Sequence, residues 1–317
     1  MISAILIPND MNILIYGTGG VGGFFGGKLA LTEHKVTMIA RGAHLEAIQK
    51  DGLKVKSVTG DFTAHPHLAT DDLSKIETPD LVLFGVKSWQ LPQAIKDILQ
   101  YCDDNTLFLP LQNGADNAEK LNDVAQKSQV LNGLCRMISF IESPGVISNP
   151  DVPPTLLLGE QDNTRTKRVE EILAIFKSAG IDAAIPENIQ VAIWQKFLFI
   201  TVVSALGGLT RVSIGALREN NYTNDLMLKT AQEVLKVATA KGIHLPENTI
   251  DNTFKAINSQ AYGTTASTQR EIMEGKPSEL ENFNGYIVKE GKRLGVATPV
   301  NEMIYELLLP QEKKVRS

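Results

Sequence analysis

The chain has 317 residues, of which 43% are hydrophobic and 21% charged, and its formal net charge is −5. This length favours two domains with sizeable cores. The acidic balance argues against nucleic-acid binding, because no basic stripe is available to displace the counterions of a phosphate backbone. The two cysteines, Cys102 and Cys135, show neither the CxxC spacing of a metal or redox site nor the density of a secreted disulfide scaffold. We therefore expect a cytoplasmic globular protein.

Two apolar stretches raise the question of targeting or membrane insertion. The first ten residues lack a basic region and a small-residue cleavage site, so no signal peptide is expected, and Met11 is an alternative start. The stretch Val191–Thr210 approaches membrane-spanning length, but it contains Gln195 and Lys196 and has no flanking basic clusters. A buried helix in a soluble domain explains this stretch better than a membrane span.

The first half of the chain alternates short apolar runs with helical stretches, which is the pattern of a parallel sheet covered by helices. Strands are predicted at Asn12–Tyr16, Val36–Ala40, Leu81–Val86, Thr106–Leu109, Val130–Ile141 and Thr155–Leu158. Helices are predicted at Val21–Leu31 and Thr164–Ala179. The expected fold of this half is an α/β, Rossmann-like, doubly wound parallel sheet.

From about Glu187 the sequence changes to long periodic stretches with few strand-like runs. Helices are predicted at Asn188–Leu206, Asn224–Lys241, Pro246–Asn258 and Ser278–Arg293. Because proline disfavours helix at the residue before it, a domain boundary near Pro186 is favoured. The sequence therefore predicts an α/β domain over residues 1–186 and an all-α domain over residues 187–317.

A glycine-rich loop, Gly17-Thr18-Gly19-Gly20-Val21-Gly22, lies between the first predicted strand and the first predicted helix. In a dinucleotide-binding loop of this form Gly17 permits the tight turn, Gly19 lets the backbone approach the pyrophosphate, and Gly22 lets helix and strand pack closely. The helix N-terminus offers unpaired N–H groups to the anion. The alternative is a glycine-rich turn without a ligand, but the strand-to-helix context favours a dinucleotide site.

The residue after the second predicted strand indicates which dinucleotide is bound. NAD-selective proteins carry an acid about 20 positions beyond the glycine loop, whereas a basic residue there suits a 2′-phosphate. No acid occurs between Glu33 and Glu46, and the second strand is followed by Arg41. A guanidinium can bind a phosphate bidentately and stack on adenine, so NADPH is the expected cofactor. A solvated surface arginine is the alternative interpretation.

Six short motifs occur in the order typical of one protein family. They are GTGGVGGFFGGKLA from Gly17, IARG at Arg41, FGVKSWQ at Lys87, LQNG at Asn113, WQKF at Lys196 and STQREIMEGKPSELENFNG from Ser267 to Gly285. Over nearly its whole length the chain thus resembles the 2-dehydropantoate 2-reductases, or ketopantoate reductases. The resemblance implies NADPH-dependent reduction of ketopantoate to pantoate in pantothenate and coenzyme A biosynthesis. It also implies a C-terminal domain like that of 6-phosphogluconate dehydrogenase.

Two polar residues follow predicted strands at the edge where open α/β sheets bind ligands. Lys87 comes just after one apolar strand, and Asn113 lies in a turn after the next. By resemblance both contact the cofactor or the substrate. Taken alone, a solvated lysine and an asparagine that stabilises its own turn explain them equally well.

Lys196 is the candidate for the chemical step, because it and Gln195 are the only strongly polar residues between Val191 and Ile200. A lysine in a cleft can donate a proton to a carbonyl oxygen as hydride reaches the carbon. The alternative is a stem packed on the helix with its charge in water. In the family, the matching lysine is the general acid.

The motif from Ser267 supplies two further site residues by resemblance. Glu279 would lie in the active-site cleft, near the catalytic lysine and the bound ligands, and Ser267 would bind the substrate carboxylate. Both also have simpler interpretations: Ser267 as a polar residue near a helix start, and Glu279 as an acid in a first helical turn. A capping box of Ser278 and Glu281 would begin that helix.

The chain departs from the family where substrate selectivity is expected. Ketopantoate reductases usually carry asparagines four and eight residues after the catalytic lysine, but here these positions are Ile200 and Ser204. An alkyl group in place of an amide removes both a donor and an acceptor, so a substrate hydroxyl could lose its partner. A 2-oxo acid with a less polar side chain than ketopantoate is therefore a credible substrate.

Other functions were weighed against this reductase. One is a related hydroxy-acid or opine-forming enzyme, and another is a non-catalytic NADPH-binding module, which the joint presence of Lys87, Asn113, Lys196 and Glu279 argues against. The five histidines form no zinc pattern, so no metal is expected. The apolar helical half can supply a homodimer contact as readily as an interdomain one.

Overall fold

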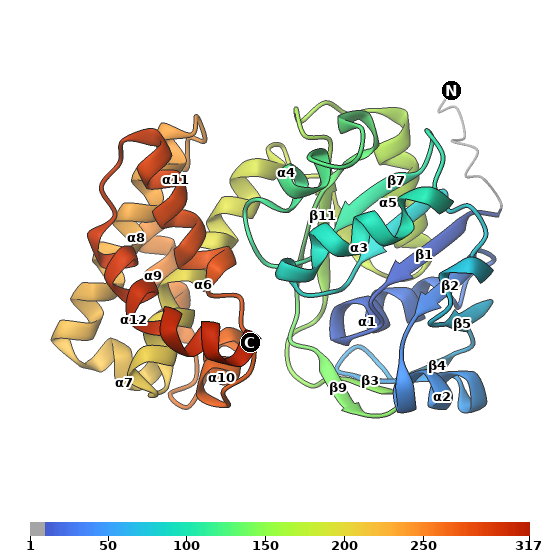
Figure 1. Ribbon diagram of the computed structural model, residues 1–317, viewed down its shortest axis with the longest axis horizontal. Helices are drawn as coiled ribbons and strands as arrows, with labels where there is room; N and C mark the ends of the chain where they lie inside the picture. Colours follow the sequence, from blue (N-terminus) through green and yellow to red (C-terminus); the bar gives the residue numbers. More distant parts are fainter. Residues whose placement is uncertain (1–9) are drawn as a thin grey trace. The chain divides into compact units, whose positions relative to one another are not determined.

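The computed structural model describes residues 10–317 and divides into two compact units. The first unit ends at Ile189 and carries all the strands of the described chain, and the second begins at Gln190 and is helical (Figure 1). Each unit has its own core and is described by itself. The predicted combination of an α/β Rossmann-like fold with a helical C-terminal part is confirmed.

A five-stranded parallel sheet forms the centre of the first unit, with the strand order β5-β2-β1-β6-β7. The strands are β1 (Asn12–Tyr16), β2 (Lys35–Ile39), β5 (Leu68–Thr70), β6 (Leu81–Phe84) and β7 (Leu107–Pro110). The four residues of β6 are all apolar and buried, as expected for a parallel strand covered on both faces. The order reverses at β1, with earlier crossovers on one side and later ones on the other. Such a switch point is where open α/β sheets bind ligands.

Helices cover both faces of this sheet (Figure 1). They are α1 (Gly20–Leu29), α2 (Gly42–Asp51), α3 (Leu91–Ile98), α4 (Asn117–Asn122) and α5 (Lys167–Ser178). Because successive side chains of a strand point to opposite faces, Ile13 and Ile15 join the core that includes α1 and α5, whereas Leu14 and Tyr16 join the core that includes α3 and α4. The period-two alternation of one short strand thus supplies both cores.

Two smaller sheets complete the first unit, with the orders β4-β3-β10-β9 and β12-β11-β8. Their strands are β3 (Leu53–Ser57), β4 (Phe62–Ala64), β8 (Asn132–Arg136), β9 (Phe140–Ser143), β10 (Val146–Asn149), β11 (Thr155–Gly159) and β12 (Asp182–Ala184). The single strand predicted over Val130–Ile141 was wrong, because β8 and β9 belong to different sheets. The chain turns between them where Ser139 Oγ donates a hydrogen bond to the Gly20 carbonyl at 3.0 Å.

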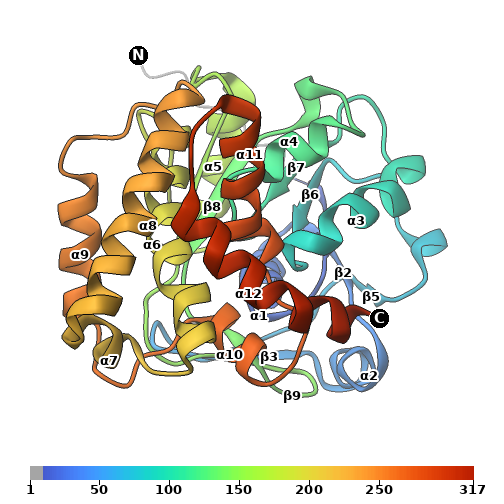
Figure 2. The same ribbon diagram turned by 60° about the vertical axis from the view of Figure 1, so that its left-hand side comes forward.

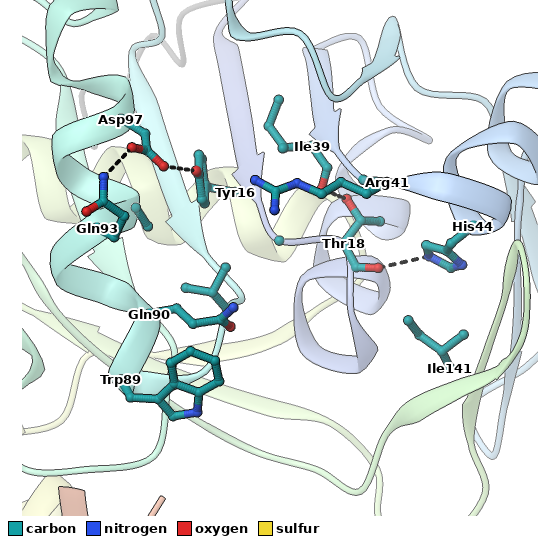
Figure 3. A pocket seen from close by; sticks show the side chains of 14 residues that line it. Tyr16, Thr18, Ile39, Arg41, His44, Trp89, Gln90, Gln93, Asp97 and Ile141 are labelled. Atoms are coloured by element: carbon teal, nitrogen blue, oxygen red, sulfur yellow. Dashed lines mark hydrogen bonds between the residues drawn. The ribbon is translucent and has the colours of Figure 1, made fainter. Parts of the chain in front are cut away.

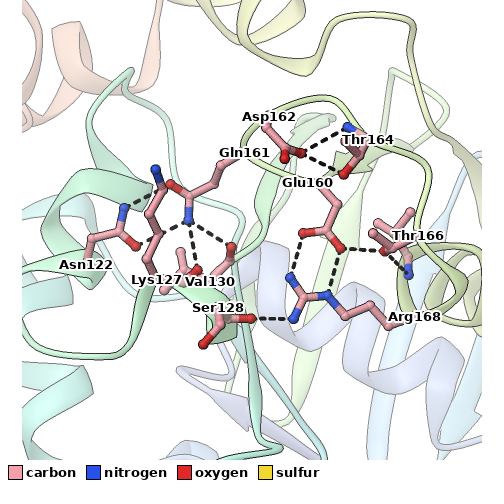
Figure 4. A network of polar contacts seen from close by, with 11 residues as sticks. Asn122, Lys127, Ser128, Val130, Glu160, Gln161, Asp162, Thr164, Thr166 and Arg168 are labelled. Atoms are coloured by element: carbon pink, nitrogen blue, oxygen red, sulfur yellow. Dashed lines mark hydrogen bonds and ion pairs between the residues drawn. The ribbon is translucent and has the colours of Figure 1, made fainter.

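A polar network fixes the end of β11 against the first turn of α5 (Figure 4). Arg168 binds both oxygens of the buried Glu160, at 2.7 and 2.6 Å, and also donates to the Ser128 carbonyl. Thr166, the N-cap of α5, donates to the same carboxylate at 2.5 Å. Burial favours the neutral acid, but the hydrogen bonds from Arg168 and Thr166 outweigh it and hold the pKa of Glu160 below its usual value. We interpret this network as structural, because the charges of Glu160 and Arg168 neutralise each other.

The second unit packs helices on helices (Figure 2). They are α6 (Ile189–Thr210), α7 (Ile214–Glu219), α8 (Asn221–Ala240), α9 (Thr249–Ser259), α10 (Ser267–Met273), α11 (Tyr286–Leu294) and α12 (Pro299–Arg316). The helix predicted over Ser278–Arg293 is shorter than expected, because a π-helical turn, Glu281–Gly285, precedes α11. Helix α12 continues through Pro310, a residue that usually ends a helix.

Helix α6 is the one helix in the described chain that is long and apolar enough to cross a membrane, and 67% of its most apolar window is buried inside the structure. Trp194 and Phe197 on this helix pack their rings against Tyr286 of α11 at centroid distances of 6.2 and 5.8 Å. Its apolar side chains therefore form part of the core of the helical unit, as the sequence predicted.

Glu290 on α11 is a buried acid that pairs with two cations of this unit. Arg293 binds both of its oxygens, at 3.0 and 2.7 Å, and Lys241 donates to it at 2.9 Å from the end of α8. The hydrogen bonds from Arg293 and Lys241 outweigh the cost of burial and lower the pKa of Glu290 to about 2. The carboxylate therefore joins α8 and α11 in its charged form.

We expect Glu290→Gln to lower the free energy of unfolding at neutral pH by about 2 kcal/mol, the contribution of hydrogen bonds to a charged group. Because the folded-state pKa is depressed, this stabilisation is complete above the ordinary pKa of 4.5 and is lost as the pH falls through about 2. Urea unfolding of both proteins, followed by tryptophan fluorescence, should give curves that converge as the pH is lowered. The exposed pair Lys292–Glu302 is the control, and Glu302→Gln should cost less than about 1 kcal/mol.

Candidate cofactor-binding and catalytic residues

A pocket of about 450 Å³ opens at the carboxyl ends of β1 and β2, in the first unit (Figure 3). This volume lies within the usual range of small-molecule sites, about 300 to 1,000 Å³. Its lining comes from the ends of both strands, the segment after β6, the start of α2, one face of α3, and β9. The lining residues are Tyr16, Gly17, Thr18, Ile39, Ala40, Arg41, His44, Val86, Trp89, Gln90, Gln93, Ala94, Asp97 and Ile141. The pocket therefore lies at the switch point of the parallel sheet.

The glycine loop folds as a tight link between β1 and α1. Gly17 has φ +100°, and a side chain there would meet the Val86 backbone nitrogen at 2.8 Å. A side chain at Gly22 would collide with the Gly17 carbonyl oxygen. These two glycines thus allow the turn and the close packing of helix on strand, as the sequence analysis expected.

Gly19 differs from its neighbours, because the chain itself does not need a glycine there. Its φ is −85°, and an added Cβ would meet only the Gly85 carbonyl oxygen, at 4.0 Å. Gly19 is the N-cap of α1, beside the N–H groups that have no partner within a helix. The open space at this residue is what close approach by a phosphate group would require. The loop therefore fits the pyrophosphate of a dinucleotide.

Arg41 is the N-cap residue of α2 and lines the pocket with an exposed side chain. Figure 3 shows its guanidinium extending toward Tyr16. No residue from Glu33 to Glu46 other than Arg41 supplies a charged side chain to this pocket. Arg41 can therefore reach a phosphate or an adenine ring bound in the pocket.

An acid that the sequence analysis missed lines the same pocket. Asp97 on α3 accepts hydrogen bonds from Tyr16 Oη at 2.8 Å and from Gln93 Nε2 at 2.6 Å. Burial and the bond to Asp97 raise the pKa of Tyr16 to about 12, although the charge of Arg41 acts in the opposite direction. The pocket thus contains one carboxylate as well as one guanidinium.

Lys87 and Asn113 lie at the carboxyl ends of the neighbouring strands β6 and β7. Lys87 precedes a short 3₁₀ turn, Ser88–Gln90, and its N–H donates to Gln90 Oε1 at 3.1 Å. Ser88 Oγ donates to the Asn113 carbonyl, so the two segments are joined. The turn at Asn113 is also held by Asn117, which donates to the Gln112 carbonyl at 3.0 Å. The structure brings these two predicted residues together, outside the lining of the pocket in Figure 3.

Lys196, Ile200 and Ser204 follow one another at four-residue spacing on α6, and so lie along one face of the helix. Lys196 and Ile200 are partly exposed, whereas Ser204 is buried. The face thus presents an amine, a branched alkyl group and a small hydroxyl in succession.

Glu279 belongs to the same unit as Lys196 and is buried. Its carbonyl accepts hydrogen bonds from the N–H groups of Asn282 and Phe283. Phe283 packs on Phe197, the neighbour of Lys196, at a ring distance of 6.3 Å. The segment after Glu279 is therefore held against α6 next to the candidate catalytic lysine, and its π-helical turn is a feature often found at functional sites.

The predicted capping box of Ser278 and Glu281 was wrong. Ser278 donates to Glu312 Oε2 at 2.6 Å, and Glu281 accepts from Tyr305 at 2.5 Å. Both side chains make hydrogen bonds to residues of α12, because the chain before α11 packs against that helix. Ser267 begins α10 and is exposed, so its hydroxyl is accessible to a ligand.

Comparison with known proteins decides the family. A model described as ketopantoate reductase PanE/ApbA matches residues 13–163, and the model of the C-terminal part of that family matches residues 188–312. The chain belongs to the ketopantoate reductase PanE/ApbA family. The resemblance inferred from the six sequence motifs is thereby confirmed.

Individual relatives match along almost the entire chain. The uncharacterized oxidoreductase YkpB of Bacillus subtilis is 28% identical over 297 residues, which cover 93% of this chain and 97% of that protein. The 2-dehydropantoate 2-reductase of Pyrococcus abyssi is 28% identical over 302 residues, covering 95% and 98%. The crystal structure of a PanE/ApbA family ketopantoate reductase from Ralstonia eutropha has a TM-score of 0.89 at 28% identity, covering 97% and 100%.

Membership in the ketopantoate reductase family defines the type of chemistry. The protein is an oxidoreductase that acts on a CH–OH group of a small molecule and depends on a pyridine nucleotide. The Rossmann-like unit with its glycine loop is consistent with this dependence.

Proposed function

We propose that the protein uses NADPH to reduce a 2-oxo acid to a 2-hydroxy acid in the cytoplasm. The default substrate is 2-dehydropantoate (ketopantoate), and the product pantoate serves pantothenate biosynthesis. One observation carries the proposal: in a chain of the ketopantoate reductase family, the switch-point pocket is lined by both the glycine loop and Arg41. An anionic dinucleotide is the ligand that this combination suits.

In this proposal the first unit binds the dinucleotide, which supplies the hydride. The N–H groups at the start of α1, from Gly19 to Gly22, bind the pyrophosphate, and Thr18 keeps the loop attached to β2. Arg41 binds the 2′-phosphate, since its five N–H donors match phosphate oxygens bidentately. Lys87 and Asn113, at the ends of β6 and β7, contact the nicotinamide part and the substrate.

The second unit supplies the proton. Lys196 donates it from Nζ to the oxygen of the substrate carbonyl, which becomes an alkoxide-like group as its carbon is reduced. Glu279 is buried in the segment packed beside Lys196, where a carboxylate favours the charged form of an amine and orients it. Ser267 binds the substrate carboxylate through its exposed hydroxyl.

A second candidate substrate is favoured by one feature of α6. Ile200 and Ser204 stand where ketopantoate reductases usually carry asparagines, and Ile200 offers no hydrogen bond to a substrate hydroxyl. A site built to bind a hydroxyl rejects an analogue that lacks it, whereas an apolar site discriminates far less. The alternative substrate is therefore a branched 2-oxo acid without a side-chain hydroxyl.

The test is a panel of 2-oxo acids with and without a side-chain hydroxyl, with oxidation of the reduced nicotinamide followed by absorbance. We expect turnover of at least one branched 2-oxo acid, and Ile200→Asn with Ser204→Asn should raise the kcat/KM ratio of ketopantoate over its deoxy analogue by about tenfold or more. Each single variant serves as the control for the pair.

Two other outcomes are informative. Tight NADPH binding without turnover of any panel member would contradict the reductase and favour a non-catalytic binding module. If neither Ile200→Asn nor Ser204→Asn raises the turnover of ketopantoate, the result would favour a substrate that shares only the carboxylate with ketopantoate.

A further inference from the structure

His44 makes a hydrogen bond with each of its ring nitrogens, and both partners belong to the backbone of the first unit. Its Nε2 lies 2.9 Å from the Thr18 carbonyl oxygen, and the Gly145 N–H points to its Nδ1 at 2.9 Å. His44 comes from the first turn of α2, three residues after Arg41, and lines the same pocket. Figure 3 shows the bond to Thr18, and together the two bonds join the glycine loop, α2 and the turn between β9 and β10 through one side chain.

The two partners define the protonation state of the ring. A backbone N–H can only donate, so Nδ1 accepts from Gly145 and carries no proton. A backbone carbonyl can only accept, so Nε2 carries the proton and donates to Thr18. Burial lowers the pKa of His44 below its usual value, which agrees with a neutral ring.

The backbone of Gly145 is fixed by its conformation and by its contacts with neighbouring elements. Its φ is +74°, a value that favours glycine, and an added Cβ would meet the Ala47 Cβ at 2.8 Å. Its carbonyl also accepts from the Lys54 N–H of β3 at 2.9 Å. The turn is therefore anchored to α2 and β3, and it presents its N–H to the imidazole at a fixed place.

Thr18 is held by hydrogen bonds on both sides of its α-carbon. Its N–H and its hydroxyl both donate to the Ile39 carbonyl, at 3.1 and 2.9 Å, and its own carbonyl accepts from His44. In a trans peptide the C=O and the following N–H point in opposite directions. The bond from His44 therefore turns the Gly19 N–H away from the imidazole and opposes a peptide flip that would aim the Thr18 carbonyl at a bound anion.

We propose that His44, through the Nε2–H bond to Thr18, is a positioning residue that presets the glycine loop for the dinucleotide. This inference rests on the proposed cofactor site. Presetting the loop lowers the cost of binding, because the backbone does not have to be ordered or rotated when the pyrophosphate arrives. The bond to Gly145 serves to orient the ring and to fix its tautomer.

Two substitutions separate the two bonds of the ring. Glutamine places an amide nitrogen near the position of Nε2, so His44→Gln retains a donor for Thr18 and loses the acceptor for Gly145. Asparagine places its amide oxygen near the position of Nδ1, so His44→Asn retains the acceptor and loses the donor. Each variant keeps one hydrogen bond, and we expect similar melting temperatures for the two.

The experiment measures NADPH and NADH dissociation constants of the full-length protein by nucleotide fluorescence, with the melting temperature of each variant alongside. We expect His44→Asn to weaken both nucleotides about tenfold, the value of one lost hydrogen bond, and His44→Gln to stay within about threefold of the parent. His34→Asn is the matched control, because His34 is also a partly buried histidine whose Nδ1 accepts a backbone N–H, from Met11. It should leave both constants unchanged.

The competing outcomes are distinct. Equal losses of affinity in the two variants, in step with equal losses of melting temperature, would mean that His44 only stabilises the fold. Unchanged affinity in both would also overturn the inference while leaving the proposed function intact. Failure of the parent protein to bind either nucleotide would overturn the proposed cofactor site and the role of His44 together.

Discussion

Replacing Lys196 with methionine should abolish most turnover and leave cofactor binding intact. Methionine keeps an unbranched side chain that can pack in the same place on α6, but it carries no proton to donate. General acid catalysis contributes about 10²- to 10⁴-fold, so we expect kcat to fall by that factor. Steady-state kinetics with a 2-oxo acid gives kcat, and NADPH titration gives the dissociation constant, which should stay within about twofold of the parent.

The neighbouring residue provides the control for this result. Gln195 has a similar partial exposure on the same helix, but it lies on a different face from Lys196. Gln195→Ala should therefore keep kcat within about threefold of the parent, while its effect on folding is comparable. Full activity of Lys196→Met would contradict the assignment of the proton donor. A parallel loss in both variants would point to damage of the helical core instead.

The parts of the fold that were predicted correctly depend on local signals. The β1 strand, the glycine loop and α1 were recognised because a short apolar run, a tight turn and a helix follow one another within one continuous segment. Helix α6 was likewise evident from an apolar stretch too long for a strand. The family was recognised because six motifs occurred in order, although each one alone is weak.

The parts that could not be predicted depend on contacts between distant segments. The run Val130–Ile141 contains no proline, and its one glycine, Gly133, lies inside β8, so nothing local marks the turn that separates β8 from β9. That turn is set where residue Ser139 meets Gly20 on α1. Very short strands, such as the three residues of β5, also carry too little pattern to be recognised without the sheet that they join.

The candidate site shows the same division. Arg41 could be inferred because it comes two residues after the end of β2. Asp97 could not, since it lines the same pocket from α3, where it accepts hydrogen bonds from Tyr16 and Gln93. His44 was not recognised as a site residue from the sequence. Its two backbone partners come from the glycine loop and from Gly145, and only the folded chain brings them to one ring.

Changing Arg41 to aspartate should reverse the preference between the two reduced nucleotides. The guanidinium offers charge-assisted bidentate hydrogen bonds to a 2′-phosphate, and an acid at this position repels that phosphate but can accept hydrogen bonds from a ribose 2′-hydroxyl. We expect the dissociation constant for NADPH to rise about a hundredfold or more, while that for NADH changes by less than about fivefold. Both constants are measured by fluorescence titration, so the result does not depend on knowing the substrate.

The presence of Asp97 in the same pocket makes this experiment decisive for the cofactor. Arg165→Ala is the matched control, because Arg165 is an exposed arginine of the same unit that pairs with Glu170 away from the pocket, and it should leave both constants unchanged. If the parent protein already binds NADH more tightly than NADPH, the carboxylate of Asp97 outweighs Arg41 and the proposed cofactor is wrong. In that case Asp97→Asn should weaken NADH, whereas an NADPH-selective pocket should bind the phosphate at least as well once this negative charge is removed.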